Sequence, residues 1–306
     1  MKKLITTKMI KEFRIVNEEK RTVQVTTPDE RWYCKQMDDK ETGLPVIVWK
    51  PSITFITSSY PKGIGYIKWV ADRGYDKAEE IKIEAGDRGT IVHHAIEKLI
   101  TEGKLKMDDK IKDREGVERE MTPDEYYCVM TFAQWYETNG KPKTIAVERT
   151  VESEKYGYAG TLDYLFELNG ENVLVDIKSN KYIFPSHELQ VSALKQACAE
   201  EELKVDKIAI LQVGYLANKS QHYKFTEIED QFSLFLATKE IWAKEHGKDK
   251  PLQRNYPLQI ELTPTTSVNE SAESGEVEVA TEHEAEIAEA MNLKVRKVNK
   301  KQNGNF

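Results

Sequence analysis

The chain has 306 residues, of which 39% are hydrophobic, so it is long enough to bury a sizeable core in one large domain or two. Its apolar runs all fall short of the about 18 residues that a membrane-spanning helix needs. Residues 1–11 also lack the apolar centre of a signal peptide. These features predict a soluble, cytoplasmic protein with no membrane partner.

The formal net charge of -7 is unusual for a nucleic-acid-binding protein, because phosphate binding normally requires a basic surface. The excess is uneven, since residues 257–306 hold nine acidic and five basic side chains, leaving 43 acidic and 40 basic residues elsewhere. A nearly neutral body with an acidic metal site remains compatible with DNA, because bound cations reverse the local charge.

The three cysteines are Cys34, Cys128 and Cys198. They lie too far apart in sequence to offer a disulfide framework or the close spacing of a zinc or iron-sulfur site. We expect unpaired thiols and no iron-sulfur cluster.

The first 50 residues show the alternation that is typical of strands at 22–26, 31–36 and 45–49, with a polar turn at 38–43. They predict a small antiparallel N-terminal element. Helical signals follow at 51–74, and apolar residues at helical spacing predict a stronger helix over 88–102 that ends at Gly103. Thr122 is a suitable N-cap, and Pro123 suits the first position of a helix that runs to residue 139.

The period then changes, and three short strands are predicted at 144–151, 160–168 and 172–177, with a tight hairpin at Asn169 and Gly170. A helix over 186–201, strands over 207–216 and 223–225, and a helix over 227–246 complete the pattern. This order predicts an α/β fold whose mixed central sheet is flanked by helices. The polar and charged residues 257–306 predict a mostly disordered tail.

Two carboxylates stand where buried strand positions are expected, namely Asp163 and Asp176, and burying them needs compensation. Hairpin pairing about Asn169 and Gly170 would place these two residues almost opposite each other. Lys178 lies on the same strand face as Asp176 by the two-residue period. The structural interpretation is a buried ion pair between aspartate and lysine. The Asp-x-Lys motif taken alone favours this interpretation.

The functional interpretation is a site for a hard divalent cation, because magnesium and manganese prefer oxygen ligands such as two carboxylates and the carbonyl of Ile177. The cation would bind a scissile phosphate, activate water and stabilise the leaving oxygen. Lys178 would position the attacking water or neutralise the charge that develops on phosphorus.

Three further residues are candidates. Gln190, early in the following helix, would hydrogen-bond the lysine or a phosphate, or else lie at the surface. Glu148 would supply another carboxylate to the metal or its water shell, or else be a solvated strand residue. His93 would ligate a metal, or else be a partly buried core histidine.

Together these residues resemble the RecB-like branch of the PD-(D/E)XK nucleases, which includes CRISPR-associated Cas-type and AddB-type exonucleases. That branch has Gly-Thr-x-x-His on a helix, Gly-x-x-Asp on a strand, Asp-x-Lys on the next strand, and a helix led by glutamine. The corresponding residues here are Gly89-Thr90-Ile91-Val92-His93, Gly160-Thr161-Leu162-Asp163, Asp176-Ile177-Lys178 and Gln190. The branch often has a tyrosine four residues after the glutamine, where this chain has Leu194.

The resemblance covers roughly residues 51–215, and Pro51-Ser52-Ile53-Thr54 followed by Trp69 also looks like phage exonucleases and the mitochondrial genome maintenance exonuclease. It implies a restriction-endonuclease-like core and one or two Mg²⁺ or Mn²⁺ ions. It also implies hydrolysis of single-stranded DNA or DNA ends, in a bacterium or a phage-infected host cell. We expect an exonuclease of DNA replication, recombination or repair, working with a protein partner from the same process.

The predicted organisation is therefore a β-rich element over 1–50, a nuclease domain over 51–256, and the tail over 257–306. The competing hypothesis is a member of the same fold that binds DNA or protein without cutting, because fold does not determine function.

Overall fold

The computed structural model describes residues 12–18, 20–26, 30–38, 43, 45–114 and 116–247. The chain divides into two compact units, one over residues 53–245 and the other combining 1–52 with 246–306. The predicted tail over 257–306 lies outside the described residues, as do residues 39–42 of the predicted turn. The functional labels given to 1–50 and 51–256 remain predictions.

The N-terminal unit contains a four-stranded antiparallel sheet in the order β1-β2-β3-β4. Its strands are β1 (Glu12–Asn17), β2 (Thr22–Thr26), β3 (Arg31–Asp38) and β4 (Pro45–Pro51). Trp32 and Tyr33 of β3 are buried, and Trp32 meets Trp49 edge to face with ring centroids 6.4 Å apart. The antiparallel element is confirmed, and β1 is an additional strand that the sequence pattern did not predict.

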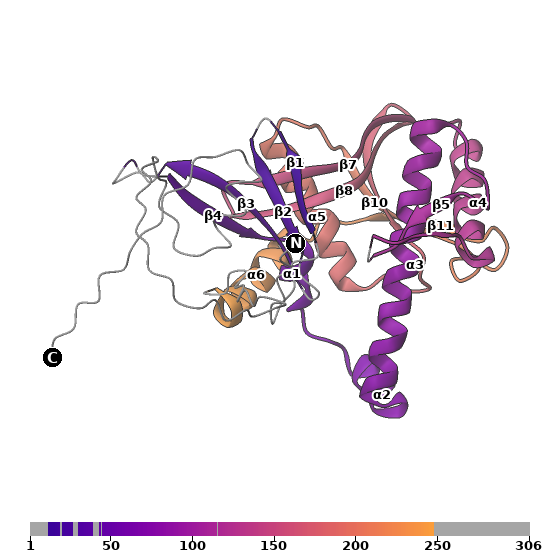
Figure 1. Ribbon diagram of the computed structural model, residues 1–306, viewed down its shortest axis with the longest axis horizontal. Helices are drawn as coiled ribbons and strands as arrows, with labels where there is room; N and C mark the ends of the chain where they lie inside the picture. The colour runs from indigo at the N-terminus through magenta and orange to yellow at the C-terminus, as the bar shows by residue number, and fades with distance from the viewer. Residues whose placement is uncertain are drawn as a thin grey trace, which may run out of the picture. The chain divides into compact units, whose positions relative to one another are not determined.

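The second unit is built on a five-stranded sheet in the order β11-β10-β9-β8-β7 (Figure 1). Its strands are β7 (Lys143–Ser153), β8 (Tyr158–Leu168), β9 (Glu171–Lys178), β10 (Lys207–Val213) and β11 (Tyr223–Ile228). Only β9 and β10 pair in parallel among these strands. Helix α5 (Pro185–Glu200) supplies the crossover that this parallel pair needs.

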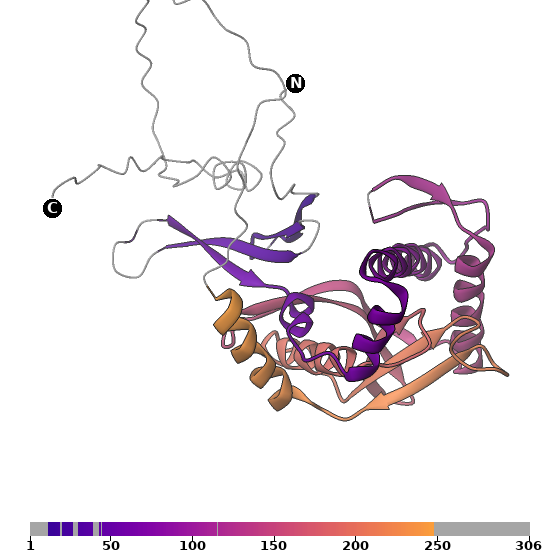
Figure 2. The same cartoon turned by 90° about the horizontal axis from the view of Figure 1, so that it is seen from below.

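Helices cover both faces of this sheet. Tyr164 and Phe166 of β8 share one core with α3 (Tyr75–Glu102) and α4 (Pro123–Thr138), whereas α5 contacts four of the strands, β7 to β10. Because successive strand residues point to opposite faces, Leu165 belongs to the other side of the sheet. Figure 2 shows α3 nearly end-on beside the strands. The predicted α/β fold with a mixed central sheet flanked by helices is confirmed.

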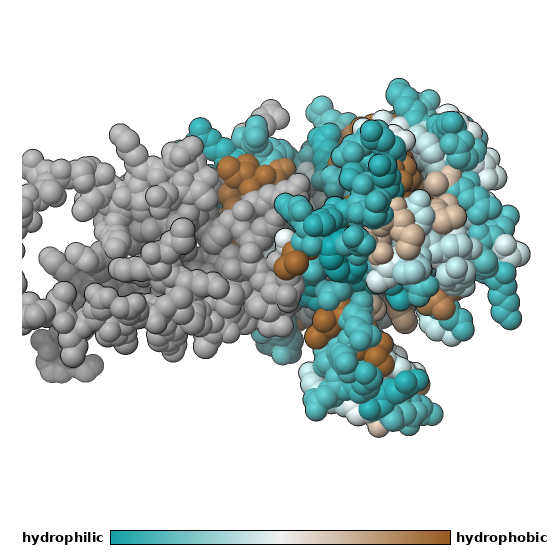
Figure 3. All heavy atoms as spheres, turned by 45° about the vertical axis from the view of Figure 1, so that its right-hand side comes forward, coloured by the Kyte–Doolittle hydropathy of each residue, from teal (hydrophilic) through white to brown (hydrophobic). Residues whose placement is uncertain are grey.

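The remaining elements of this unit are α1 (Ile53–Ser58), α2 (Ile64–Arg73), α6 (Phe232–His246) and a small hairpin of β5 (Lys110–Lys112) and β6 (Glu118–Glu120). Helix α2 buries none of its residues, and with the first half of α3 it extends away from the sheet in Figure 1. Ile64, Ile67 and Ile83 are exposed there, and Figure 3 shows apolar surface on this projecting part. No helix in the described part of the chain is long and apolar enough to cross a bilayer.

Several predicted boundaries were wrong. Helix α3 begins at Tyr75 rather than near residue 88, because Gly86 and Gly89 weaken a helix without ending one. Helix α6 begins at Phe232 rather than 227, because β11 continues to Ile228, which pairs with Ile208. Strand β10 ends at Val213 rather than at 216, because the next residue, Gly214, takes a φ of 95° that does not continue a strand.

Candidate metal centre

Three acidic residues lie side by side at one level of the sheet. The β8–β9 ladder ends at the pair Tyr164–Val175, so Asp163 and Asp176 are the next residues on the two strands. On the other side of β8, the pairs Val147–Tyr164 and Arg149–Leu162 place Glu148 beside Asp163. The hairpin turn that sets this register has φ values of 53° at Asn169 and 82° at Gly170, as a tight type I′ turn requires.

Asp176 is completely buried, and burial raises the pKa of its carboxyl group despite the neighbouring charge of Lys178. Lys178 Nζ lies 2.6 Å from Asp176 Oδ2. Apart from this contact, neither carboxylate oxygen has a hydrogen-bond partner among the described residues. Burial acts to lower the pKa of Lys178, but the charges of Asp176 and Asp163 outweigh it and raise that pKa. The lysine is therefore held as an ammonium beside the buried carboxylate.

Asp163 ties β8 to the end of β9. Its Oδ2 accepts a hydrogen bond from the backbone N–H of Ile177 at 2.8 Å. Burial raises the pKa of Asp163, with the negative charge of Glu148 adding to the rise. The carboxylate thus has little access to water, and a cation nearby would relieve the cost of its charge.

His93 reaches the same point from α3. Its Nε2 lies 3.0 Å from the carbonyl oxygen of Ile177, and its Nδ1 lies 3.5 Å from Asp163 Oδ2 and 3.8 Å from Glu148 Oε1. Burial acts to lower the pKa of His93, but the charges of Asp163 and Glu148 outweigh it and raise that pKa to about 9. The imidazole of His93 therefore lies against two carboxylates and a carbonyl oxygen.

Glu148 shows two signs of a functional constraint. Its φ of 43° lies in the left-handed region, which costs a residue with a side chain roughly 1–2 kcal/mol. Its Oε1 is buried and has no hydrogen-bond partner among the described residues. Strained residues with unsatisfied polar atoms cluster at ligand sites.

These donors fit a divalent cation. Suitable ligand atoms of His93, Glu148 and Asp163 all lie within 4.8 Å of one another. Two carboxylates, an imidazole and the Ile177 carbonyl form a donor set dominated by oxygen, which suits magnesium or manganese. The buried carboxylate of Asp176, whose oxygens lack hydrogen bonds among the described residues apart from the contact with Lys178, offers a further ligand.

Gln190 lies in the second turn of α5 and is half-buried. Within the described residues, no hydrogen bond joins it to Lys178. Its predicted support of the lysine or of a phosphate stays a prediction.

Several polar residues around the centre were not predicted from the sequence. Arg88 donates from Nη2 to the carbonyl of Ser179 at 3.2 Å, and Gln212 donates from Nε2 to the carbonyl of Asn180 at 2.9 Å. His187 lies close enough for the charges of Lys178 and Asp176 to act on its pKa. Arg88 directly precedes the Gly-Thr-x-x-His segment, which was the one signal that sequence offered for it.

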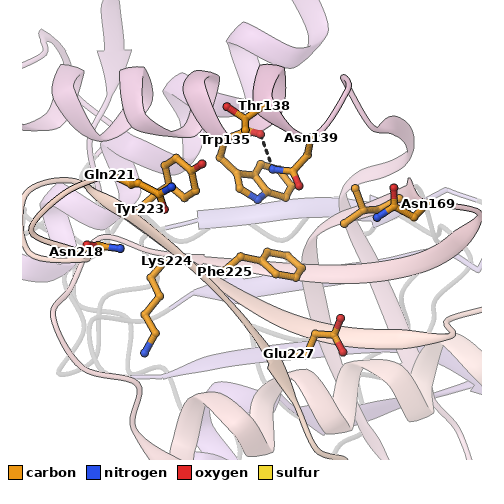
Figure 4. A pocket seen from close by; sticks show the side chains of 11 residues that line it. Trp135, Thr138, Asn139, Asn169, Asn218, Gln221, Tyr223, Lys224, Phe225 and Glu227 are labelled. Carbon is orange, nitrogen blue, oxygen red and sulfur yellow. Dashed lines mark hydrogen bonds between the residues drawn. The ribbon is translucent and has the colours of Figure 1, made fainter.

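A separate pocket of about 450 Å³ opens elsewhere on this unit (Figure 4). Aromatic residues of α4 and β11 and several amide side chains line it, including Trp135, Phe225, Asn139 and Asn218. No residue of the predicted site lines this pocket.

Comparison with known proteins gives partial structural similarity only. No protein-family model matches the sequence, and no curated protein sequence matches it. The alkaline exonuclease LHK-Exo from Laribacter hongkongensis is 11% identical, with a TM-score of 0.34 over 64% of this chain and 84% of that chain. The structure of LHK-Exo in complex with dAMP is 12% identical, with a TM-score of 0.33 over 65% of this chain and 89% of that chain.

Proposed function

We propose that this protein is a metal-dependent deoxyribonuclease, acting as an exonuclease in bacterial or phage DNA replication, recombination or repair. The observation that carries the proposal is the buried Asp176, which lies against Lys178 and beside the cluster of His93, Glu148 and Asp163. A buried carboxylate that lacks hydrogen bonds contributes little to the stability of a fold. The same carboxylate is a suitable ligand for a divalent cation. The order of the motifs, resembling the RecB-like nucleases, supports the same proposal.

In the proposed reaction, a water oxygen attacks phosphorus, the bond to the leaving oxygen breaks, and that oxygen takes up a proton. His93, Glu148, Asp163, Asp176 and the Ile177 carbonyl would hold one or two Mg²⁺ or Mn²⁺ ions. A bound cation would supply Lewis-acid activation of water and phosphate. Lys178 would orient the water or neutralise charge on the phosphate, and Gln190 would support it.

The proposed substrate is single-stranded DNA or a DNA end, and a replication or recombination protein is the proposed partner. The decisive experiment is digestion of DNA labelled at the 5′ or 3′ end, single- or double-stranded, with Mg²⁺, Mn²⁺ or a chelator. Matched RNA substrates test the choice of nucleic acid. Asp176→Asn is compared with the wild type, and Asp108→Asn serves as the control because Asp108 is exposed and outside the cluster.

We expect metal-dependent cleavage that Asp176→Asn abolishes and Asp108→Asn leaves intact. The order in which labelled products appear then gives the polarity of digestion. Cleavage that survives Asp176→Asn, or folded protein that binds DNA without metal and cuts none of the substrates, would support the competing hypothesis of a non-catalytic binding protein.

A further inference from the structure

The segment over residues 179–184 connects the candidate metal centre to α5. It begins directly after Lys178 and ends where α5 starts at Pro185. Its first two carbonyls accept the hydrogen bonds from Arg88 and Gln212. At its other end, the carbonyl of Phe184 accepts a hydrogen bond from the backbone N–H of His187 at 2.8 Å. The first end of the segment is therefore anchored beside the centre, and the other end continues into α5.

Two aromatic side chains on this segment face solvent. Tyr182 is 59% exposed and Phe184 is 48% exposed. Their ring centroids lie 6.5 Å apart with an interplanar angle of 57°, and His187 meets Phe184 edge to face at 5.3 Å. Exposed neighbouring aromatic rings contribute little to a core, and such surfaces mark places where a ligand binds.

The aromatic rings are close to the proposed point of cleavage. Tyr182 follows Lys178 by four residues, so the two Cα atoms are separated by at most about 14 Å. Even at the short rise of about 3.4 Å per nucleotide of a stacked strand, that distance is at most roughly four nucleotides. His187, which touches Phe184, also responds to the charges of Lys178 and Asp176.

Two lysines carry positive charge near the same rings. Lys181 Nζ lies 5.1 Å from the centroid of the Tyr182 ring, and the charge of Lys62 acts on His187. In a protein with a net charge of -7, these cations favour an anionic ligand at this place. Aromatic rings combined with lysines suit an unpaired nucleic-acid strand, whose bases stack while its phosphates meet the cations.

We propose that Tyr182 and Phe184 form a stacking platform for an unpaired nucleobase of the strand that is cut. This inference rests on the proposed nuclease function, because the ligand is placed by its distance from the metal centre. It narrows the substrate to single-stranded DNA or an end whose terminal base pair has opened. A base in a closed duplex already stacks on its neighbours and has no free face for the rings.

The test compares binding of two fluorescent thymidine oligonucleotides of equal length, one intact and one with abasic sites. Each is titrated by fluorescence anisotropy with full-length Asp176→Asn protein, so that cleavage cannot interfere. The platform variant adds Tyr182→Ala and Phe184→Ala. The control adds Tyr75→Ala instead, because Tyr75 is 69% exposed but stands at the start of α3.

We expect the platform variant to bind the intact oligonucleotide about ten- to a hundredfold more weakly, while the Tyr75 control is unchanged. The abasic oligonucleotide should bind about equally to all of these proteins. Replacement by Tyr182→Phe and Phe184→Trp should retain tight binding, because rings remain, and circular dichroism checks that each variant is folded.

Equal binding of intact and abasic oligonucleotides by the parent protein would overturn the platform, and so would equal loss of both in the alanine variant. Digestion by the protein with Asp176 intact is measured separately. A base-dependent binding contrast without any digestion would support the platform and overturn the nuclease. Digestion without a base-dependent binding contrast would support the nuclease and overturn the platform.

Discussion

Asp176 and Lys178 form a buried ion pair that is expected to contribute little to the stability of the fold. Removing an ion from water costs several kcal/mol even after relaxation, and the attraction between partners repays it only when the remaining oxygens are hydrogen-bonded. Apart from the contact with Lys178, the oxygens of Asp176 have no such partner among the described residues. The arrangement is better explained by a ligand that the carboxylate receives than by a contribution to folding.

Substitution of Lys178 by methionine tests whether the lysine acts in cleavage and not in metal binding. We expect Lys178→Met to reduce DNA cleavage about 100- to 1000-fold, as loss of a group that stabilises transition-state charge does. Mn²⁺ should still raise the melting temperature, because His93 and the carboxylates remain. Lys219→Met, at an exposed lysine between β10 and β11, is the control. Unchanged cleavage in Lys178→Met would remove the lysine from the reaction.

At the scale of elements, side chains from α1 and α5 pack closely against β8 at Gly160. A Cβ added there would lie 2.5 Å from Cδ1 of Ile53 in α1 and 3.1 Å from Cδ2 of Leu194 in α5. The glycine of the Gly-x-x-Asp segment therefore lets two helices approach the strand that carries Asp163. Its role is to permit packing rather than to supply a turn.

Gly160→Ala should accordingly destabilise the protein. We expect the free energy of unfolding to fall by about 1–3 kcal/mol, the usual cost of overpacking a core. Gly65→Ala is the matched control, since Gly65 lies in α2 with no atom near the added Cβ. There, the better helix propensity of alanine should raise stability by up to about 1 kcal/mol. Urea unfolding measures both, and equal effects would contradict the packing argument.

Glu125 caps the start of α4 and is only 3% exposed. It accepts hydrogen bonds from both terminal nitrogens of Arg119, at 2.8 and 2.6 Å, and from the backbone N–H of Thr122 at 2.8 Å. Burial acts to raise the pKa of Glu125, but Arg119 and Thr122 outweigh it and lower that pKa. A lowered pKa in the folded state stabilises the protein above the usual glutamate pKa, and this stability is lost as the pH falls.

We therefore expect Glu125→Gln to lower the free energy of unfolding by about 1–3 kcal/mol at pH 7. The difference from wild type should shrink as the pH falls below the usual glutamate pKa of about 4.3, because the unfolded state then gains a proton before folded Glu125 does. Urea unfolding at pH 7 and at pH 3 measures it, with exposed Glu118→Gln as the control. A difference of the same size at pH 7 and pH 3 would show that the ion pair is not its cause.

At the scale of the whole molecule, every residue of the candidate centre lies in the unit over residues 53–245. The net charge of -7 includes a contribution of -4 from residues 257–306. Around the centre, three lysines stand beside the carboxylates, so the local charge is more balanced than that of the molecule; the lysines are Lys178, Lys181 and Lys62. Total charge is therefore a poor guide to the ligand of this protein.

Deletion of residues 257–306 should leave metal-dependent cleavage of short oligonucleotides unchanged, because none of the proposed metal ligands lies there. Steady-state digestion by the truncated and full-length chains, compared at the same salt concentration, measures this. Lost cleavage in a folded truncated protein would place part of the function in the tail. Loss confined to recruitment of a partner would leave catalysis in the body and assign partner binding to the tail.

Local patterns were enough to predict the hairpin and its two aspartates. Asn169 and Gly170 allow a two-residue turn, and the period of two then fixes which residues of β8 and β9 face each other. The same reasoning failed at the start of α3, because glycine lowers helix propensity without revealing what the neighbouring turns pack against. It also failed at β11, whose end depends on the partner strand β10.

The sequence by itself determined the α/β order of elements and predicted the candidate ligands, because strand period, turn chemistry and motif spacing are local. Only the tertiary structure decided that His93 meets the carbonyl of Ile177 across 84 residues, and that Glu148 takes a left-handed backbone beside Asp163. It alone showed that Tyr182 and Phe184 are exposed. Such contacts depend on how distant segments pack, and burial is a property of the assembled layers rather than of any segment.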